Sequence, residues 1–357
     1  MKVLHITHAF YPSVGGLELH IEKLSRELGC DVLTVNKKAE RKLPSYENYK
    51  GIKVYRLPFL NLRHYKIFHP KILSIIKNYD VLHIHNLGFI SDFVGLTKFI
   101  HKKPIILSTH GGIFHTKNMG FLKKIYFNLW CRFIFRYVDK VIANSKNDKI
   151  LFSDISKNIT YISDAVDFEK FSSIKRKPDE NIFLSVGRVA KNKRIDLMIE
   201  TFFHIQKKKP NAKLFVIGDF YLDKGNFTDM IKSKGLEKSV FLLGKVPEED
   251  ILKHMEKAGF FLSSSEYEGF GISVMEAMAA GIPVIVNDID AFRNFVMNGK
   301  NGFLIDYFKP KDAADSILEI MKKDNSNISK ESRKTAKKYD WDIIIEKLKK
   351  TYESVDY

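Results

Sequence analysis

The chain has 357 residues, of which 45% are apolar, so it is long enough to bury two hydrophobic cores of ordinary domain size. Its two cysteines, Cys30 and Cys131, have no metal-ligand spacing and cannot build a disulfide framework, which favours a reducing cytoplasm. We expect no signal peptide, because the polar-interrupted start leads straight into a glycine loop, and no apolar run is long enough to cross a bilayer.

The net charge of +17 is carried mainly by the first half of the chain. Residues 1–165 contain 26 Lys and Arg against 12 Asp and Glu, whereas residues 166–357 contain 33 against 30. A basic half predicts binding to nucleic acid, to an anionic membrane or to an anionic substrate. Nucleic acid is the weakest of these, because the sequence has no zinc-finger spacing, RNP-type aromatic strand or basic zipper. A generally lysine-rich source organism is the plain alternative.

The first half alternates short apolar strands with amphipathic helices, the pattern of a parallel α/β domain. The glycine pair Gly15-Gly16 follows the first strand and precedes a helix, without the G-x-G-x-x-G spacing or a Walker A lysine. It is interpreted either as a close approach of backbone to a ligand or as a plain tight turn. Strands are expected at 2–7, 31–35, 52–57, 81–85, 104–109 and, closing the domain, 140–145.

His110 comes directly after the fifth of these strands, and ligands of open α/β sheets bind at the carboxyl ends of strands. Its imidazole is suited to orienting a hydroxyl of a bound donor or to acid–base chemistry near neutral pH. A lone histidine in a loop is, however, more often structural. His83 and His85 alternate along the preceding strand, and either can be a satisfied core histidine.

Residues 117–137 combine five basic side chains with many aromatic ones and contain no acidic residue. This composition is typical of a helix that lies on an anionic membrane surface. The alternative is a core-packing helix whose apolar face holds Leu122, Ile125, Leu129 and Phe133. The residues predicted to form a membrane or acceptor surface are Lys117, Lys123, Lys124, Trp130, Arg132 and Arg136.

The second half restarts the alternation near 159–162, which predicts a second parallel α/β domain. Arg188 and Lys193 share the loop after its first long strand. A guanidinium fork and an ammonium group in one loop can stabilise a departing diphosphate without a metal, although a basic loop taken alone is usually just solvated. Strands are expected at 182–188, 213–218, 240–244 and 259–265, with helices at 197–206 and from Trp341 onward.

A glycine turn, Gly269 to Gly271, joins the last of these strands to a helix expected over 272–280. Free backbone N–H groups at a helix N-terminus attract anions, so the turn predicts a phosphate site. Glu268 and Glu276 flank it, and a sugar nucleotide accounts for both, since a carboxylate accepts hydrogen bonds from vicinal hydroxyls. The plain alternative is a carboxylate that only complements the helix dipole.

These motifs resemble the retaining glycosyltransferases of family 4, whose GT-B fold has two facing Rossmann-like domains and a deep cleft between them. The similarity spans nearly the whole chain, through Gly15-Gly16-x-Glu18, the Arg188 and Lys193 pair, and the Glu-x7-Glu run that starts at Glu268. The resemblance implies an N-terminal acceptor-binding domain over 1–163, a nucleotide-sugar-binding domain over 164–339, and a C-terminal helix at 340–357 that packs back on the first domain.

The resemblance also implies roles for individual residues. Glu268 would lie beside the transferred sugar, His110 near that sugar, and Arg188 with Lys193 on the leaving diphosphate; these four form the expected catalytic set. Glu276 would hold the ribose hydroxyls. The expected donor-binding residues are Gly15, Gly16, Val246, Phe270, Gly271, Ile272 and Glu276.

Two segments depart from the family pattern. The usual Pro-Asn-Gly-Val-Asp at the domain junction is Ser163 to Asp167 here, and the usual Val-Gly-x-Gly is Ile217 to Phe220. These differences affect the expected local backbone geometry and the donor preference.

The expected activity is a retaining, metal-independent transfer of a hexose from a UDP- or GDP-linked sugar to a lipid-linked or cell-surface glycan acceptor, in polysaccharide or lipopolysaccharide biosynthesis. We expect no cofactor, no metal ion and no nucleic acid, and a cytoplasmic protein peripheral at the inner face of the cell membrane. Two alternatives are open: a nucleotide-sugar epimerase of the same architecture, and a non-catalytic membrane or nucleic-acid binding protein.

Overall fold

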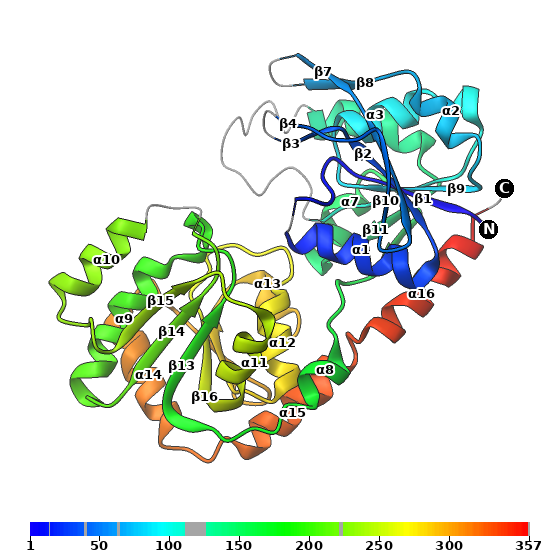
Figure 1. Cartoon of the computed structure of the whole chain (residues 1–357). Helices are drawn as coiled ribbons and strands as arrows, with labels where there is room; N and C mark the ends of the chain where they lie inside the picture. The colour runs from blue at the N-terminus through cyan, green and yellow to red at the C-terminus, as the bar shows by residue number, and fades with distance from the viewer. Residues whose placement is uncertain (14, 39–40, 63–64, 111–125, 221–223, 356–357) are drawn as a thin grey trace. The chain divides into compact units, whose positions relative to one another are not determined.

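The computed structural model describes residues 1–13, 15–38, 41–62, 65–110, 126–220 and 224–355. It divides the chain into two compact domains (Figure 1). The N-terminal domain comprises Met1–Asp164 and Asp342–Tyr357, and the C-terminal domain comprises Ala165–Trp341. The sequence analysis placed the two junctions after residue 163 and before residue 340, one to two residues away.

A mostly parallel sheet forms the centre of the N-terminal domain. In the described part of the chain it has eight strands in the order β12-β11-β10-β9-β1-β2-β6-β5, and β5 alone pairs antiparallel. Its inner strands are near-continuous apolar runs because both faces of a parallel sheet are covered. The strand bounds are β1 Val3–Ile6, β2 Asp31–Val35, β5 Tyr46–Tyr49, β6 Ile52–Leu57, β9 Val81–His85, β10 Ile105–Ser108, β11 Lys140–Ala143 and β12 Ile159–Tyr161.

Two expectations about this sheet are wrong. The sheet does not close at 140–145, because β12 pairs with β11, placing Val141 opposite Ile159. Residues 159–162 therefore form the edge of the first domain instead of the start of the second. The second edge strand, β5, was not predicted, because Tyr46–Tyr49 alternates between exposed and half-buried residues and lacks an apolar run.

Helices pack on both faces of this sheet. Helix α1 (Gly16–Leu28) buries Ile21 and Leu24, and it ends because Gly29 takes the left-handed conformation, with φ of 63°. The other helical segments among the described residues of the domain are α2 Ile72–Ile76, α3 Phe89–Leu96, α4 Lys98–His101, η1 Tyr126–Cys131, α6 Arg132–Ile134, η2 Phe135–Tyr137, α7 Lys146–Ser153 and α16 Trp341–Glu353. Two short hairpins are added, β3 Lys37–Lys38 with β4 Arg41–Lys42 and β7 Phe59–Leu62 with β8 Tyr65–Phe68.

The basic, aromatic segment 117–137 is described only from Tyr126 onward. Lys117, Lys123 and Lys124 therefore lie outside the described residues. The remainder starts with a π-helical turn, η1, and its buried side chains are Phe127, Cys131, Ile134 and Phe135. The core-packing face that included Leu129 and Phe133 is wrong, since these are 69% and 38% exposed. A π-helical turn is wider than an α-helical one, so it changes which side chains face the core.

The C-terminal domain is a second doubly wound α/β unit. In the described residues its parallel sheet has six strands in the order β15-β14-β13-β16-β17-β18. The strands are β13 Asp179–Val186, β14 Lys213–Ile217, β15 Val240–Gly244, β16 Ala258–Ser263, β17 Val284–Asn287 and β18 Phe303–Ile305. The helices are α8 Phe168–Ser172, η3 Lys191–Lys193, α9 Ile195–Lys208, α10 Lys224–Ser233, α11 Glu248–Lys257, α12 Ile272–Ala280, α13 Asp290–Arg293, α14 Pro310–Met321 and α15 Ser326–Lys337.

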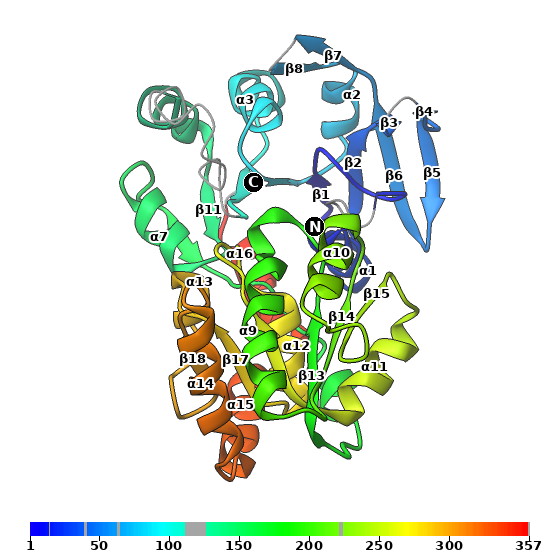
Figure 2. The same ribbon diagram turned by 90° about the vertical axis from the view of Figure 1, so that its left-hand side faces the viewer.

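Two hydrophobic cores cover the two faces of this sheet. Phe183 of β13 points into the core shared with α9 and α14, which lie side by side (Figure 2). Its neighbour Leu184 points into the opposite core, which α12 completes with Val274 and Met278. Alternate side chains of one strand thus anchor helices on opposite faces.

The strand order reverses at β13, since β14 and β15 extend to one side of it and β16 to β18 to the other. In open α/β sheets, such a switch point leaves a crevice at the carboxyl ends of the two central strands. The loops after β13 and β16 are therefore the expected place for a ligand. Among the described residues, every helix is too short or too polar to span a bilayer.

Candidate active site

A small pocket lies at the carboxyl ends of β13 and β16, where the strand order reverses. Two glycines make close approach of the backbone possible there: a Cβ atom at Gly218 would lie 1.8 Å from the carbonyl oxygen of Gly187. The pocket is lined by Ser185, Val186, Gly187, Arg188, Lys193, Ile195, Met198, Val216, Ser263, Ser264 and Ser265. The structure thus brings the predicted residues Arg188 and Lys193 to one pocket, with Arg188 exposed at the surface.

An ion pair joins two of the predicted catalytic residues. Lys193 Nζ lies 2.5 Å from Glu268 Oε1, and the two side chains are only 21% and 12% exposed. Ser265 Oγ donates a further hydrogen bond of 2.9 Å to the same carboxylate oxygen. Ser264 Oγ donates to the carbonyl oxygens of Lys193 and Arg194, both at 2.8 Å. The two serines that follow β16 therefore hold the loop of Lys193 and the carboxylate of Glu268 in place.

The glycine turn before α12 is shaped by packing. Gly271 has φ of 101° and precedes the helix without a side-chain cap. A Cβ atom at this position would lie 2.6 Å from the Phe292 ring, so both the conformation and the space require glycine. Phe270 is buried against Phe295 and Tyr339, with ring centroids 5.4 and 5.5 Å apart. Phe270 can therefore serve a ligand only through its backbone.

The opposite end of α12 is stabilised by two arginines. Arg333 Nη2 donates to the carbonyl oxygen of Ala280 at 2.8 Å, and Arg176 donates to the carbonyl oxygen of Gly281. Burial and the neighbouring Arg333 lower the pKa of Arg176 to about 10. Positive charge at a helix C-terminus is favourable. The negative end of α12 is thus compensated inside the protein, whereas its N-terminus is open to an anion.

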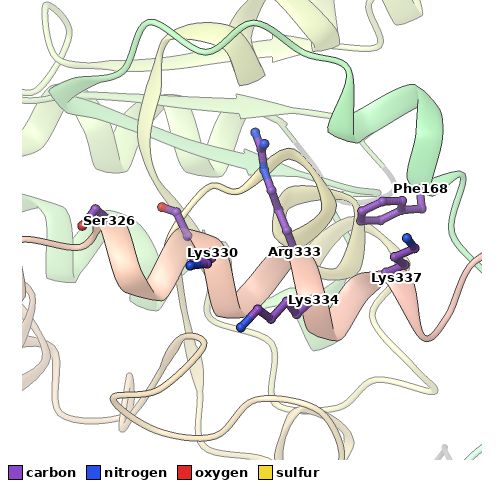
Figure 3. Close-up of a pocket in the computed structure, with 7 residues that line it drawn as sticks. Phe168, Ser326, Lys330, Arg333, Lys334 and Lys337 are labelled. Atoms are coloured by element: carbon purple, nitrogen blue, oxygen red, sulfur yellow. The ribbon is translucent and has the colours of Figure 1, made fainter.

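A larger hollow of about 520 Å³ lies along α15, away from the predicted site residues. Figure 3 shows Arg333 extending from the helix past this hollow, with Phe168 beside Lys337. Lys334 Nζ is paired with Glu331 at 2.6 Å. Arg333, which lines this hollow, is the residue that caps the C-terminus of α12. We therefore assign the hollow a structural role.

Glu276 lies one turn along α12 and is half-buried. Its burial raises the pKa of this carboxyl to about 7; Lys170 opposes the shift, while Glu248 and Asp167 add to it. Among the described residues, no group donates a hydrogen bond to it. A desolvated carboxylate without a donor is costly. A ligand hydroxyl would remove that cost.

Val246 is placed at the edge of the same domain. It is half-buried against the core that contains α12 and lies just after β15. The last residue of that strand, Gly244, accepts a hydrogen bond of 2.9 Å from the backbone N–H of Gly218. The segment is thus tied to the strand ends that form the pocket.

The N-terminal domain holds the remaining predicted residues. Gly15 caps α1, and Gly16 is the first residue of the helix. The Glu18 carboxylate folds back over this end, because a Cβ atom on Gly15 would lie 2.5 Å from its Oε2. A carboxylate of the chain itself thus faces the N-terminus of α1, a capping arrangement.

His110 is held tightly at the carboxyl end of β10. Its backbone is in the left-handed region with φ of 42°, and its N–H donates to Asn144 Oδ1 at 3.1 Å. The ring lies 3.0 Å from His85 through Nε2 and 3.9 Å from Asp164 through Nδ1. Burial, aided by His20 and His8, lowers its pKa well below the usual range, so this ring is neutral at physiological pH.

Sequence reasoning missed two polar residues of these sites. Ser265 was predicted only as the last residue of the strand expected at 259–265, although it contacts Glu268, three residues further along the chain. Asp164 lies beside His110, and burial together with Asp148 raises its pKa to about 7, opposed by a hydrogen bond from Asn144. Its signal was the departure from the family pattern at the domain junction.

Comparison with known proteins now identifies the family. The model of Glycosyltransferase Family 4 matches residues 14–170, and that of Glycosyl transferases group 1 matches residues 166–339. The GDP-mannose:cellobiosyl-diphosphopolyprenol alpha-mannosyltransferase of Xanthomonas campestris is 29% identical over 362 residues, which cover 97% of this chain and 94% of that protein. The protein of the same name from Komagataeibacter xylinus is also 29% identical, with 99% and 93% covered.

Solved structures agree with this match. Anabaena HepE in complex with UDP has a TM-score of 0.81 at 19% identity, covering 99% of this chain and all of that one. The lipopolysaccharide outer core galactosyltransferase WaaB has a TM-score of 0.72 at 17% identity, with 99% of each chain covered. At these identities the structures show the fold alone. Taken with the two family matches and the pair of parallel-sheet domains, they show that this chain is a glycosyltransferase of family 4 with the GT-B fold.

Proposed function

We propose that this enzyme is a retaining, metal-independent hexosyltransferase that uses a nucleotide diphosphate sugar and a lipid-linked acceptor. The observation that carries the proposal is the preassembled group at the switch point of the C-terminal domain, where Lys193, Glu268 and Ser265 are joined by hydrogen bonds. The mannosyltransferase relatives support GDP-mannose as the first donor to test and a polyprenyl diphosphate-linked glycan as the first acceptor. The UDP-bound HepE structure supports UDP-sugars as the comparison.

The diphosphate is assigned to positive groups of the C-terminal domain. Arg188 can hold two phosphate oxygens, Lys193 adds a point charge, and the uncapped N-terminus of α12 adds backbone N–H groups. Fixed cations and dipoles of this kind stabilise the charge that develops on a leaving group. In this proposal they take the place of a metal ion.

Glu276 is assigned to the ribose. Its carboxyl group is desolvated and accepts no hydrogen bond from the described residues. Two vicinal hydroxyls would supply the missing donors. Because the pKa of Glu276 is raised to about 7, donor binding and proton release from this group would be coupled near physiological pH.

Glu268 is assigned to the transferred sugar as a hydrogen-bond acceptor. Its Oε1 already accepts from both Lys193 and Ser265, which lowers the nucleophilicity of that oxygen. This favours attack of the acceptor hydroxyl on the face that the diphosphate leaves, with a phosphate oxygen taking the hydroxyl proton. The new glycosidic bond then has the anomeric configuration of the donor.

A peripheral membrane location is part of the proposal. Leu129, Trp130 and Phe133 are exposed by 69%, 39% and 38%, beside exposed Arg132 and Arg136. Apolar and aromatic side chains flanked by cations are typical of surfaces that bind anionic bilayers.

Segments that pack beside this surface carry the same character. Helix α3 contacts α6 and η2, and the adjoining α4 exposes Phe99 and Ile100 by 74% and 54%. We expect sedimentation with anionic but not neutral vesicles, weakened by salt. Equal binding to both kinds of vesicle, or none at low salt, would contradict this part.

Donor binding and product analysis test the proposal. Calorimetric titration with GDP-, UDP- and ADP-sugars in EDTA should show micromolar to millimolar binding of one class, lost in Glu276→Ala. Proton NMR of the product should show retention of the donor's anomeric configuration. Unchanged donor binding and full transfer by Glu276→Ala would refute the site, a strict requirement for metal would refute the mechanism, and isomerisation of donor without acceptor would favour an epimerase.

A further inference from the structure

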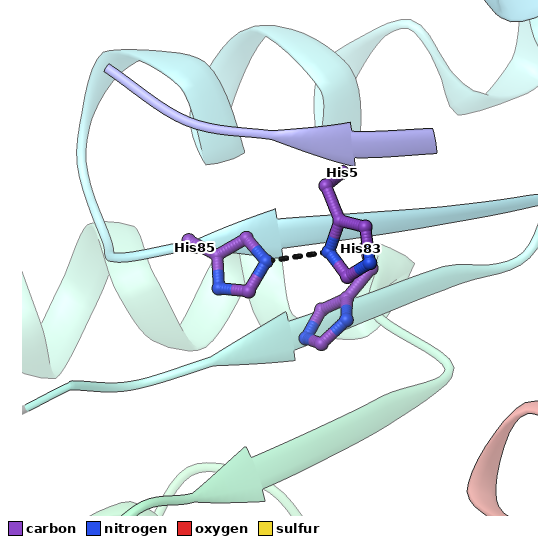
Figure 4. Close-up of side chains that lie close together, drawn as sticks. All are labelled: His5, His83 and His85. Atoms are coloured by element: carbon purple, nitrogen blue, oxygen red, sulfur yellow. Dashed lines mark hydrogen bonds between the residues drawn. The ribbon is translucent and has the colours of Figure 1, made fainter. Parts of the chain in front are cut away.

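Three imidazoles form a continuous file inside the N-terminal domain. His5 of β1 and His85 of β9 are at most 1% exposed, and His5 Nδ1 lies 2.8 Å from His85 Nε2 (Figure 4). His85 Nδ1 in turn lies 3.0 Å from His110 Nε2. The file therefore runs from the centre of the sheet to the strand end at which the predicted donor-side residue is placed.

Each hydrogen bond between two ring nitrogens needs one proton. The surroundings at the two ends of the file decide which nitrogen of each pair carries it. At the outer end, His110 Nδ1 faces the Asp164 carboxyl oxygen at 3.9 Å, which favours an N–H over a bare lone pair. At the inner end, His5 Nε2 is buried and has no hydrogen-bond partner among the described residues. A buried acceptor without a partner is tolerated better than a buried N–H without one. Both ends therefore favour protons on Nδ1 of all three rings.

The arrangement fits protons better than a metal ion. His83 is close enough to His5 and His85 for the three rings to be considered as ligands. Its two nitrogens are, however, already engaged, with Tyr352 Oη at 2.7 Å and Ser108 Oγ at 2.8 Å. The 2.8 Å between His5 and His85 is a hydrogen-bond distance, whereas two nitrogens on one zinc ion lie about 3.3 Å apart when each bond is about 2.0 Å.

We propose that His85 is a positioning residue that, supported by His5, fixes the Nδ1–H tautomer and the ring of His110. This inference rests on the proposed function for its effect on the donor. His110 is held at its backbone by Asn144 and at its ring by His85, so its left-handed conformation is fixed from two sides. With Nε2 engaged by His85 and the backbone N–H engaged by Asn144, the group whose protonation this arrangement fixes is Nδ1 of His110.

Nitrogen-15 NMR tests the proposed tautomers of His5, His85 and His110 in the absence of a sugar donor. Two-bond proton–nitrogen spectra of ¹⁵N-histidine-labelled enzyme distinguish the Nδ1–H from the Nε2–H tautomer, and the signals are assigned by single His→Asn variants. We expect Nδ1–H for His5, His85 and His110 at pH 7.5. An Nε2–H tautomer at His110 would overturn the proposal, as would uptake of one equivalent of Zn²⁺ with loss of these signals. This readout stands or fails independently of the proposed activity.

Two substitutions at His85 separate positioning from space filling. An Asn amide nitrogen occupies the place of Nδ1 and can still donate to His110, whereas a Gln amide occupies the place of Nε2 and reaches only His5. We expect H85N to keep the donor KM within about threefold and H85Q to raise it about tenfold, the loss of one hydrogen bond, with a smaller change in kcat. Equal loss in both variants, or the greater loss in the smaller H85N, would indicate a packing role and refute the proposal. His204→Asn, remote in sequence on α9, is the control.

Discussion

The two domains carry different polar groups near the ends of their central strands. The C-terminal domain has a charged ion pair, whereas the N-terminal domain has neutral histidines joined one to the next by hydrogen bonds. In the C-terminal domain, an ammonium group and a carboxylate lie 2.5 Å apart at the pocket. In the N-terminal domain, imidazoles with pKa values well below the usual range hydrogen-bond in a row. Burial depresses the pKa of both His85 and His110, and neighbouring histidines add to the effect.

The difference follows from what each region has to do. In the proposed function Lys193 faces an anionic diphosphate and has to stay ionised, and in the structure it is half-buried and paired with Glu268. Groups that only orient a neighbour do not need charge, and burying them neutral avoids the large cost of a desolvated ion. The comparison therefore separates residues that should affect rate from residues that should affect donor affinity or stability.

The strongest test of the charged region is Lys193→Met. Removing the ammonium group leaves Glu268 without its cation and, in the proposed function, takes away stabilisation of the leaving diphosphate. We expect kcat/KM to fall about 10²- to 10³-fold, as for other groups that stabilise developing charge. Lys191→Met, an exposed lysine in the same short turn, is the matched control and should stay within about twofold. A loss smaller than tenfold at Lys193 would remove it from the catalytic set.

Substitutions of two glycines, Gly271 and Gly269, test the geometry of the turn that follows Glu268. Gly271→Ala places a Cβ 2.6 Å from Phe292 at a backbone φ of 101°, so we expect the free energy of unfolding to fall by about 2–3 kcal/mol. At Gly269 a Cβ has no atom within 4 Å, and Gly269→Ala should change it by about 0.5 kcal/mol or less. Urea unfolding followed by circular dichroism measures both. Equal effects would show that the turn is not constrained by packing.

The raised pKa of Glu276 predicts how donor binding depends on pH. In the proposed function the carboxylate form accepts the ribose hydroxyls, so protonation below about pH 7 should weaken binding, up to about tenfold per pH unit. Without donor the sign for folding is the opposite: a carboxyl pKa raised from 4.5 to about 7 stabilises the fold at low pH and loses that contribution as pH rises through 7. Calorimetric titrations between pH 5.5 and 8 measure donor affinity.

Glu276→Gln is the control for this pH effect. It should bind donor weakly and with much less pH dependence. Asp164, whose pKa is also raised to about 7, titrates in both proteins and so does not account for a difference between them. Parallel pH profiles in parent and variant would place the effect elsewhere.

The smallest effect is expected at the exposed aromatic surface of the N-terminal domain. Trp130→Ser with Phe133→Ser removes exposed side chains, so the free energy of unfolding should change by about 0.5 kcal/mol or less. Binding to anionic vesicles should weaken several-fold, since apolar contact area is lost. Ile150→Ser, at an apolar position on α7 that is 72% exposed, should bind vesicles like the parent. Vesicle sedimentation at low salt separates the two.

The sequence predicted most of the fold because the inner strands are short segments rich in apolar residues. The strands at 31–35, 52–57, 81–85 and 240–244 and the helix at 272–280 have the bounds expected from it. The edge strands were harder, because β5 alternates exposed and half-buried residues and all three residues of β12 are only half-buried. The buried face of 126–137 was also wrong, because a π-helical turn breaks the regular spacing on which such a prediction depends.

The candidate site was only partly visible in the sequence. Motifs named Lys193 and Glu268, but the 2.5 Å contact joins residues 75 positions apart and needs the fold. The nearness of Asp164 to His110 depends in the same way on the fold, because these residues follow β12 and β10, which lie on either side of β11 in one sheet. The hydrogen bonds of His85 to His5 and His110 could not be predicted from the alternation of residues along a strand. A buried histidine shows the same alternation whether or not it bonds to another histidine.

The C-terminal helix α16 has a consequence for how the protein is made. Its Tyr352 hydroxyl contacts His83 at 2.7 Å, and Ile344, Leu348 and Tyr352 are buried within the N-terminal domain. That domain is therefore discontinuous: its last piece leaves the ribosome only after residues 165–341 have been synthesised. The domain whose synthesis starts first is therefore completed last. Loss of residues 342–357 should destabilise the N-terminal domain more than the C-terminal domain.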